Sequence, residues 1–330
     1  MPASRTESTV TSAILPALTA KARAAAHPLA PGPGPCACAA QDAVLAERAD
    51  ATVVRHADVV AKAHAPGTDP AELAVRLSVA ARLPGILLAP LHPAAAALHG
   101  RPVTLWPYGT PVDRDDPDAA PWEAAATLLA RLHATPPAVL PHPLPPMRGP
   151  LKAARAVDRL RQAGPHPAAA PVLRAWAGLP PWVRGEAPAP GGPGRPCHGD
   201  LHLGQLVRTP EGHWLLIDVD DLGAGHPAWD LARPAAWFAC GLLDATEWTR
   251  FLDAYRAAGG PAVPADGADP WPALDVPARA LTVQTAALAI ARATAAARPL
   301  DEVEQAVVDA CDRMGHVTAR PPELAPDGTK

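Results

Sequence analysis

The chain has 330 residues, of which 48% are hydrophobic and 19% are charged, and this composition predicts a globular protein with one large domain or two lobes. A net charge of −4, with no cluster of Lys and Arg, argues against nucleic acid as a partner. The most apolar C-terminal run contains Gln284 and Arg292, which favours a buried helix over a membrane span. The N-terminus lacks the apolar segment of a secretion signal, so we expect a cytoplasmic protein.

Cys36 and Cys38 are the one pair of neighbouring cysteines among the five in the chain. They could bind a metal, but no second Cys/His pair at zinc spacing accompanies them. Two ordinary thiols are therefore the favoured interpretation, in keeping with a reduced compartment.

Residues 1–35 are expected to form an N-terminal extension, and residues 36–110 a small β-rich lobe that binds nucleotide. The patterns in this lobe predict three strands, a helix and two more strands. Asp69 is the expected N-cap of the helix, Pro70 its first residue and Gly85 its end. The expected strands cover 42–48, 51–56, 59–64, 85–91 and 101–109.

Residues 111–330 are expected to form a larger, mainly helical lobe that carries the catalytic and substrate-binding residues. Its apolar residues recur with a period near 3.6 over 122–133 and 277–315. Residues 204–223 are the exception, because they read as two short strands joined by a TPEG turn. The fold class is therefore α+β with two lobes, and the cleft between the lobes is the default ligand site.

The stretch CHGDLHLGQLV, residues 197–207, concentrates polar residues among leucines. His198, Asp200 and Gln205 follow the pattern H-x-D-x-x-x-x-[N/Q], which is close to the catalytic loop of phosphotransferases. Asp218 in LLIDVDD comes 13 residues after Gln205, which leaves room for a hairpin that returns this carboxylate to the loop.

Phosphoryl transfer needs a lysine on the nucleotide phosphates, carboxylates on magnesium and a base that orients the attacking hydroxyl. Asp200 is the candidate base and Asp218 the candidate metal ligand. Lys62 in VVAK lies on the predicted third strand, ten positions before Glu72 on the predicted helix. That order suits a helix glutamate that steadies a phosphate-binding lysine.

These motifs resemble the aminoglycoside phosphotransferase and choline-kinase-like superfamily of small-molecule kinases over roughly residues 40 to 260. The resemblance rests on VVAK, LARLHATP, HGDLHLGQ and LLIDVDDLGAGHPAWDLA in this order. It implies a bilobal protein-kinase-like fold, ATP and Mg2+ as cofactors, and a hydroxyl group of a small molecule as the acceptor.

The resemblance also implies roles for individual residues. Asp200 resembles the catalytic base, Asp218 the main magnesium ligand and His198 the histidine that braces the loop. Asp230 in HPAWDLA resembles a buried carboxylate that holds the loop backbone. Lys62 and Glu72 resemble the N-lobe ion pair, and TLWPYG, with Trp106 and Tyr108, the hinge that receives adenine.

Two features differ from the usual family pattern. Gln205 replaces an Asn, as in the similar maltokinase-like members, and it keeps the amide oxygen that a metal needs. The first strands lack a G-x-G-x-x-G loop. Three further residues have alternative roles. His202 contacts substrate or phosphate, or braces the loop. Asp220 and Asp221 are extra metal ligands or part of a solvated turn, and the position near the metal is favoured for Asp220.

The leading hypothesis is an ATP- and magnesium-dependent phosphotransferase that acts on a hydroxyl of an aminoglycoside, a sugar or an amino sugar. The alternative is a regulatory pseudokinase in which Gln205 marks decay. A protein kinase is disfavoured, because the segment after IDVDD runs straight into HPAWDLA and leaves no room for an activation loop. Acidic residues of the C-terminal helices would suit a cationic aminosugar, but solvated helix faces explain them better: Asp244, Glu247, Asp253, Asp301, Glu302 and Glu304.

Overall fold

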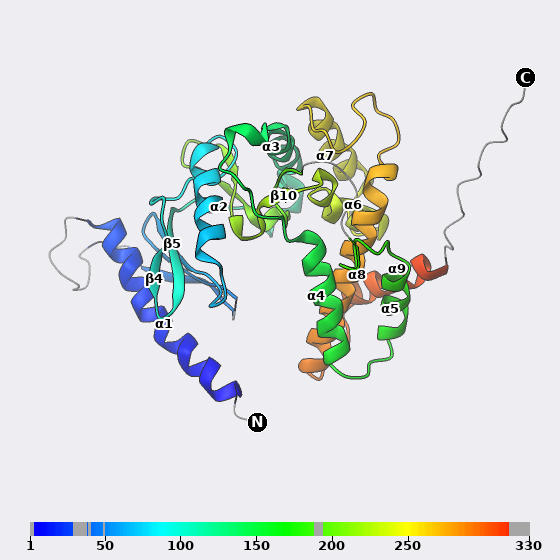
Figure 1. Cartoon of the computed structure of the whole chain (residues 1–330), viewed down its shortest axis with the longest axis horizontal. Coiled ribbons are helices and arrows are strands. Elements are labelled where there is room, and N and C mark those ends of the chain that lie inside the picture. Colours follow the sequence, from blue (N-terminus) through cyan, green and yellow to red (C-terminus); the bar gives the residue numbers. More distant parts are fainter. Residues whose placement is uncertain (1–2, 29–37, 39–40, 49, 188–193, 317–330) are drawn as a thin grey trace, which may run out of the picture.

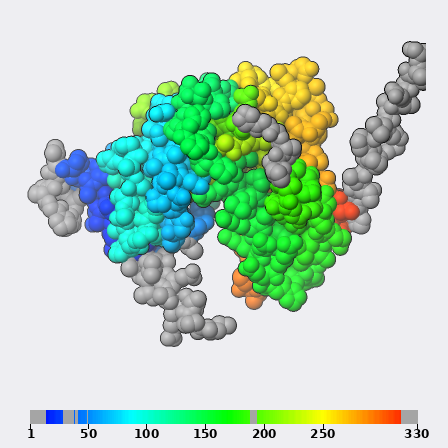
Figure 2. All heavy atoms as spheres, in the orientation of Figure 1, coloured from blue at the N-terminus to red at the C-terminus, as the bar shows by residue number. Residues whose placement is uncertain are grey.

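The computed structural model describes residues 3–28, 38, 41–48, 50–187 and 194–316. An antiparallel sheet forms the N-terminal part and helices dominate the C-terminal part, which confirms the expected α+β fold class (Figure 1). The expected domain boundary at residues 35 and 36 lies outside the described residues. In the space-filling view the surface is indented between the blue-to-cyan N-terminal part and the green surface of the C-terminal part (Figure 2).

The sheet of the N-terminal part has five antiparallel strands in the order β1-β2-β3-β5-β4. Its register places Lys62 opposite Thr104 and Val60 opposite Trp106. Because side chains alternate along a strand, these four residues share one face of the sheet. The strands are β1 (Asp42–Glu47), β2 (Thr52–His56), β3 (Val59–Ala63), β4 (Ala96–Leu98) and β5 (Arg101–Pro107).

The N-terminal segment is not an extension but a helix of the lobe, α1 (Ala3–Ala26), so the expectation for residues 1–35 is wrong for this helix. Its residues Ile14, Leu18 and Ala22 are fully buried. They pack on the sheet face opposite Lys62, against Val54, Ala61, Ala63 and Val103. The hydrophobic effect explains this packing. The Ala-rich sequence of α1 has few large apolar residues, so its pattern did not indicate a buried face.

Helix α2 (Pro70–Arg82) begins as predicted, because the Asp69 carboxylate accepts hydrogen bonds from the backbone of Ala71 and Glu72. It ends at Arg82, earlier than the predicted Gly85. The buried residues Leu73 and Leu77 of α2 join the main core.

The predicted strand at 85–91 does not join the sheet. Leu88 N–H donates to Leu216 O at 2.8 Å, and Leu216 N–H donates to Ile86 O at 2.9 Å, so this segment connects the N-terminal part to the C-terminal part. At its end, Leu91 N–H donates to Leu105 O of β5 at 2.8 Å, so the segment pairs with both parts without becoming a strand of the sheet. The sheet takes β4 from the Ala-rich stretch that follows.

The C-terminal part consists of helices and short strands. The periodic stretch at 277–315 is two helices, because Pro299 lies between them and cannot donate a helical hydrogen bond. The α-helices are α3 (Trp122–Ala134), α4 (Gly149–Gln162), α5 (Ala169–Ala177), α6 (Ala232–Ala239), α7 (Ala245–Ala257), α8 (Trp271–Ala295) and α9 (Glu302–His316). The strands are β6 (Thr110–Pro111), β7 (Arg195–Cys197), β8 (Leu206–Arg208), β9 (Trp214–Leu216) and β10 (Gly223–Gly225), and the 3-10 helices are η1 (Pro117–Ala119), η2 (Pro137–Val139), η3 (Leu203–Gln205), η4 (Val219–Asp221) and η5 (Pro227–Trp229).

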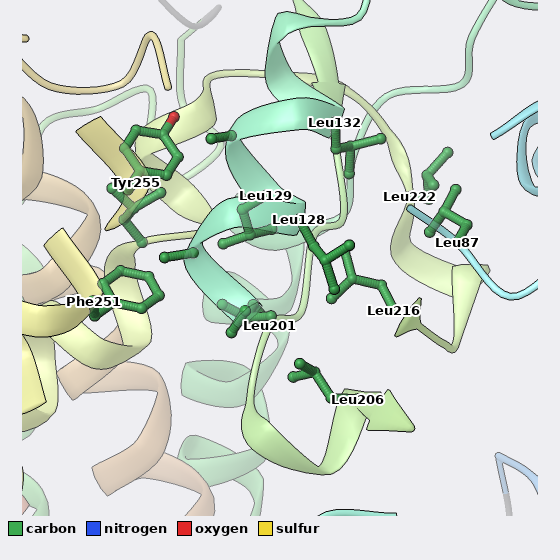
Figure 3. Packing of buried hydrophobic residues seen from close by; sticks show 14 of the residues in the cluster. Leu87, Leu128, Leu129, Leu132, Leu201, Leu206, Leu216, Leu222, Phe251 and Tyr255 are labelled. Atoms are coloured by element: carbon green, nitrogen blue, oxygen red, sulfur yellow. The ribbon is translucent and has the colours of Figure 1, made fainter. Parts of the chain in front are cut away.

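The leucines of the two polar motifs anchor them in the main core (Figure 3). Leu201 and Leu206 belong to the 197–207 loop, and Leu216 and Leu222 flank the aspartates at 218–221; all four are buried. They pack with α3 and with Phe251 and Tyr255 of α7. Among the described helices, none combines the length and apolar character that crossing a membrane requires.

Candidate active site

The 197–207 loop and the aspartate turn are held side by side by strand pairing. β7 pairs with β10, and β8 pairs with β9 in the predicted hairpin. Gly199 sits between these elements with a φ of +86°, and a side chain there would collide with the carbonyl oxygen of Asp221. Glycine is therefore required for the two segments to approach.

Asp230 is the buried anchor of the loop. Its carboxylate accepts hydrogen bonds from the backbone of His198 at 2.6 Å and of Gly199 at 2.7 Å. His133 Nε2 lies 2.9 Å from the same carboxylate, and His133 Nδ1 lies 2.8 Å from the Tyr255 hydroxyl. Burial tends to raise the pKa of Asp230, but the hydrogen bond and charge of His133 lower it on balance. The contact that the resemblance implied for Asp230 is present.

His198 supports the loop from the interior of the protein. Its side chain is fully buried, and its Nε2 lies 2.8 Å from the carbonyl oxygen of Ile217. Ile217 immediately precedes Asp218, so His198 ties the loop to the strand that ends at this aspartate. Its expected place among the catalytic residues is therefore corrected to a positioning role, because a fully buried ring cannot contact an acceptor.

Asp200 is held between two cations. Lys152 Nζ lies 2.7 Å from Oδ2 of Asp200, and Arg233 lies 2.9 Å from Oδ1. Burial would raise the pKa of Asp200, but the charges of Lys152 and Arg233 outweigh it and bring the pKa to about 2. Lys152 also contacts Asp221 at 2.7 Å, so one lysine joins the loop to the aspartate turn.

Lys62 reaches from the sheet to the aspartate turn. Its Nζ lies 2.7 Å from Asp218 and 2.9 Å from Asp220, so the two carboxylates converge on one cation. Burial would lower the pKa of Lys62, but the two aspartates raise it well above its usual value. Asp218 adopts a left-handed backbone with φ of 65°, which is uncommon for a residue other than glycine and turns its side chain toward this point.

The expected ion pair between Lys62 and Glu72 is not formed, and that prediction is wrong. Glu72 accepts from Arg76 at 2.9 Å and from Arg148 at 3.3 Å. Arg76 lies one helical turn after Glu72, where an opposite charge is a natural partner. The charge of Lys62 is already met by Asp218 and Asp220, which leaves Glu72 to the two arginines.

Gln205 lies against the strand that leads to Asp218. Its backbone carbonyl accepts from Ile217 N–H at 2.9 Å, and the residue is 8% exposed. His202 lies in the same loop. Burial and the charge of Arg233 lower its pKa to about 4, so its ring is neutral near pH 7.

Trp106 of the expected hinge is connected to the aspartate turn by a chain of contacts. Its indole N–H donates to Thr104 Oγ1 at 2.8 Å, and this hydroxyl lies 2.8 Å from His64 Nε2. His64 Nδ1 in turn lies 2.8 Å from Asp220. Trp106 therefore faces the same side of the sheet as Lys62.

Tyr108, the second aromatic residue of the expected hinge, has two partners. Its ring lies under the guanidinium of Arg55, 3.3 Å from the ring centre, and its backbone N–H donates to Asp58 O at 2.6 Å. Both contacts tie the end of this segment to the turn between β2 and β3.

Sequence reasoning did not single out three residues of the site: His64, Lys152 and Arg233. Arg233 stands three residues after Asp230 in the HPAWDLAR run, a spacing that could have drawn attention to it. Lys152 has no such signal, because contacts between distant elements bring it to Asp200: α4 packs on α8, and Arg148 N–H at the start of α4 donates to Asp221 O at 3.3 Å.

The fold is similar to those of several solved small-molecule kinases. A choline/ethanolamine kinase family protein from Mesorhizobium loti has a TM-score of 0.53 and 19% identity, over 93% of this chain and 96% of that one. A thermostable mutant of aminoglycoside phosphotransferase APH(4)-Ia, in its apo form, has a TM-score of 0.58 and 13% identity, over 84% and 96%. Spectinomycin phosphotransferase APH(9)-Ia in complex with ADP and spectinomycin has a TM-score of 0.54 and 14% identity, over 83% and 88%.

At these identities the similarity defines the class of fold, which is that of the aminoglycoside and choline kinases. The sequence itself matches the Phosphotransferase enzyme family over residues 39–275. The chain belongs to this family, and the matched residues include the loop, the aspartate turn and Lys62.

Proposed function

We propose that the protein is an ATP- and magnesium-dependent phosphotransferase whose acceptor is a hydroxyl group of a small molecule. The observation that carries the proposal is the convergence of Lys62, Asp218 and Asp220, with Asp200 joined to the same turn through Lys152. Membership in the phosphotransferase family supports it. The ADP bound by the similar spectinomycin phosphotransferase supports a nucleotide as the phosphate donor.

The residues at the aspartate turn fit a magnesium ion. Mg2+ prefers hard oxygen ligands, and Asp218 and Asp220 supply carboxylates that already converge on one positive charge, the ammonium group of Lys62. Gln205 would add its amide oxygen from the neighbouring loop. When bound, magnesium neutralises charge on the phosphates of the nucleotide.

Side chains of the protein orient the acceptor, bind the phosphates and position the loop. Asp200 is ionised at neutral pH, so it accepts a hydrogen bond from the acceptor hydroxyl and orients it. It receives the hydroxyl proton as the acceptor oxygen bonds to the terminal phosphorus and the bond from this phosphorus to the departing nucleoside diphosphate breaks. Lys62 exchanges its contacts with the aspartates for contacts with nucleotide phosphate oxygens. Asp230 and His198 keep the loop in place through the backbone and through Ile217.

Among aminoglycosides, sugars and amino sugars, the surroundings of Asp200 favour a neutral or anionic sugar over a polycation. Lys152 and Arg233 flank the carboxylate and would repel a cationic acceptor at this position. Three of the acidic residues of the C-terminal helices have partners within the protein. Asp244 caps α7, Glu247 accepts from Trp122, and Glu304 pairs with Arg298.

A panel of neutral sugars, sugar acids, amino sugars and aminoglycosides tests the proposal with purified protein, ATP and magnesium. Phosphorylated product is measured by mass spectrometry, for the wild type and for Asp200→Asn. We expect product from neutral or acidic sugars, and a turnover lower by about 10² or more in the variant, the scale for losing a general base. Nucleotide binding without product on any acceptor would favour the pseudokinase alternative.

The exposed Asp253 provides a matched control, because Asp253→Asn removes the same charge from the surface of α7, far from the loop in sequence. Its turnover should equal that of the wild type. If turnover fell equally in Asp200→Asn and Asp253→Asn, Asp200 would not be the base of the reaction.

A further inference from the structure

Two histidines and a cysteine meet on the side of the sheet that α1 covers. His27 follows the end of α1, Cys38 precedes β1 and His56 ends β2. One ligand atom from each of the three residues lies within 4.8 Å of the others. This cluster faces away from Lys62, because His56 shares its sheet face with Val54, which packs on α1.

The three ligand atoms converge on one point. His56 Nε2 lies 3.2 Å from His27 Nε2 and 3.4 Å from Cys38 Sγ. Imidazole nitrogen and cysteine sulfur are the donors that zinc prefers in proteins. His56 is buried and the other two residues are half-buried, so the site is sheltered but can be reached by an ion.

A carboxylate orients the central histidine. His56 Nδ1 lies 2.8 Å from Asp42 Oδ1, and Asp42 is itself paired with Arg23 of α1. A metal-bound histidine usually makes this contact with its second nitrogen, which fixes the tautomer and the ring orientation. Arg23 Nε donates to Asp42 Oδ1 at 3.1 Å, so the carboxylate is held between Arg23 and His56.

We propose that His27, Cys38 and His56 bind a zinc ion in the reduced protein, with Asp42 orienting His56. Three protein ligands leave a fourth position of a tetrahedral ion for water or another donor. The ion would connect the end of α1 to β1 and β2. It would therefore stabilise the packing of α1 on the sheet by binding the folded state.

Cys38 is disulfide-bonded in the structure, so the expectation of an ordinary thiol is wrong for this residue. A disulfide sulfur is not a thiolate ligand, so reduction precedes zinc binding. With a phosphine as reductant, the disulfide takes up two electrons and two protons and becomes two thiols, while the phosphine becomes its oxide with oxygen from water. The Cys38 thiol then releases its proton to solvent as zinc binds the thiolate.

Zinc binding to the full-length protein tests the site. Protein reduced with a phosphine is incubated with zinc sulfate, desalted and analysed for metal, and a second sample is first oxidised with diamide. We expect about one zinc per chain in the reduced sample and none in the oxidised one. Cobalt(II) in the reduced protein should show a thiolate charge-transfer band, which Cys38→Ser should abolish.

Variants separate this site from surface binding. His27→Ala and Cys38→Ser change half-buried residues, so they avoid the risk of unfolding that accompanies a change of buried His56. Each should lose the zinc, and Asp42→Asn should weaken affinity by about 10- to 100-fold. The exposed His92 is the matched control, and His92→Ala should retain the ion. Equal zinc in the reduced wild type and in a His27→Ala/Cys38→Ser double variant would overturn the proposal.

Discussion

Lys152 Nζ lies 2.7 Å from Oδ2 of Asp200, so the proposed base of the reaction is paired with a lysine from α4. The same ammonium group contacts Asp221 and thereby joins the loop to the aspartate turn. This contact has a measurable consequence for the pH dependence of the reaction.

Lys152→Met should move the acid limb of the activity profile to higher pH. Removing the positive charge disfavours the ionised carboxylate, so the pKa of Asp200 should rise from about 2 by roughly one to three units. Activity depends on the ionised form and is lost as the pH falls through this pKa. The measurement is kcat/KM against pH on an identified acceptor. Arg159→Met changes an exposed cation on the same helix and should leave the profile unchanged.

Lys62→Ala should raise the KM for ATP and reduce turnover, because the lysine positions phosphates. Without nucleotide, the same change should tighten magnesium binding, since Asp218 and Asp220 lose the cation that now neutralises them. Titration calorimetry with magnesium and with ATP measures the two effects, and Lys21→Ala on α1 is the control. Unchanged ATP use in Lys62→Ala would show that the nucleotide binds elsewhere.

Gln205→Ala should increase the magnesium concentration needed for half-maximal turnover, because the amide oxygen is lost. Gln205→Asn should have a milder effect, since only the reach of the amide changes. Turnover against magnesium concentration for both variants is the measurement. A curve for Gln205→Ala that superimposes on the wild type would mean that Gln205 only packs the loop.

Asp230→Asn should destabilise the protein and reduce activity together. The amide replaces one acceptor oxygen by a donor, so the backbone N–H of His198 or Gly199 or the His133 ring is left without its partner. A buried unsatisfied group costs about 1–3 kcal/mol, which should lower the midpoint of thermal unfolding by several degrees. Calorimetry compares this variant with Asp158→Asn, an exposed residue on α4 whose loss should leave the midpoint unchanged.

The parts of the site that could be predicted are those encoded in local sequence. The loop residues and Asp218 lie in two short motifs whose leucines and glycines determine the local geometry, and Asp230 follows in the same run. Ion pairs between residues on elements far apart in the sequence could not be predicted from local motifs. The predicted Lys62–Glu72 ion pair is absent because Lys62 pairs with Asp218 and Asp220 of the aspartate turn.

The same limit applies to elements whose environment is set by packing. Lys152 reaches Asp200 because α4 packs on α8 and its first turn is bonded to the aspartate turn through Arg148 and Asp221. The segment 85–91 has the composition of a strand but bonds to Leu216 across the two parts of the molecule. In each case the deciding partner is far away in sequence, so a local pattern carries no trace of it.

The position of α1 determines how far the chain can be shortened from its N-terminus without exposing the sheet. A protein shortened to begin at residue 36 would leave Val54, Ala61, Ala63 and Val103 facing water, because Ile14, Leu18 and Ala22 cover them in the full chain. Exposed apolar surface of this kind invites self-association. The N-terminal helix thus covers one face of the N-terminal sheet, and trimming it for crystallisation or expression would expose that face.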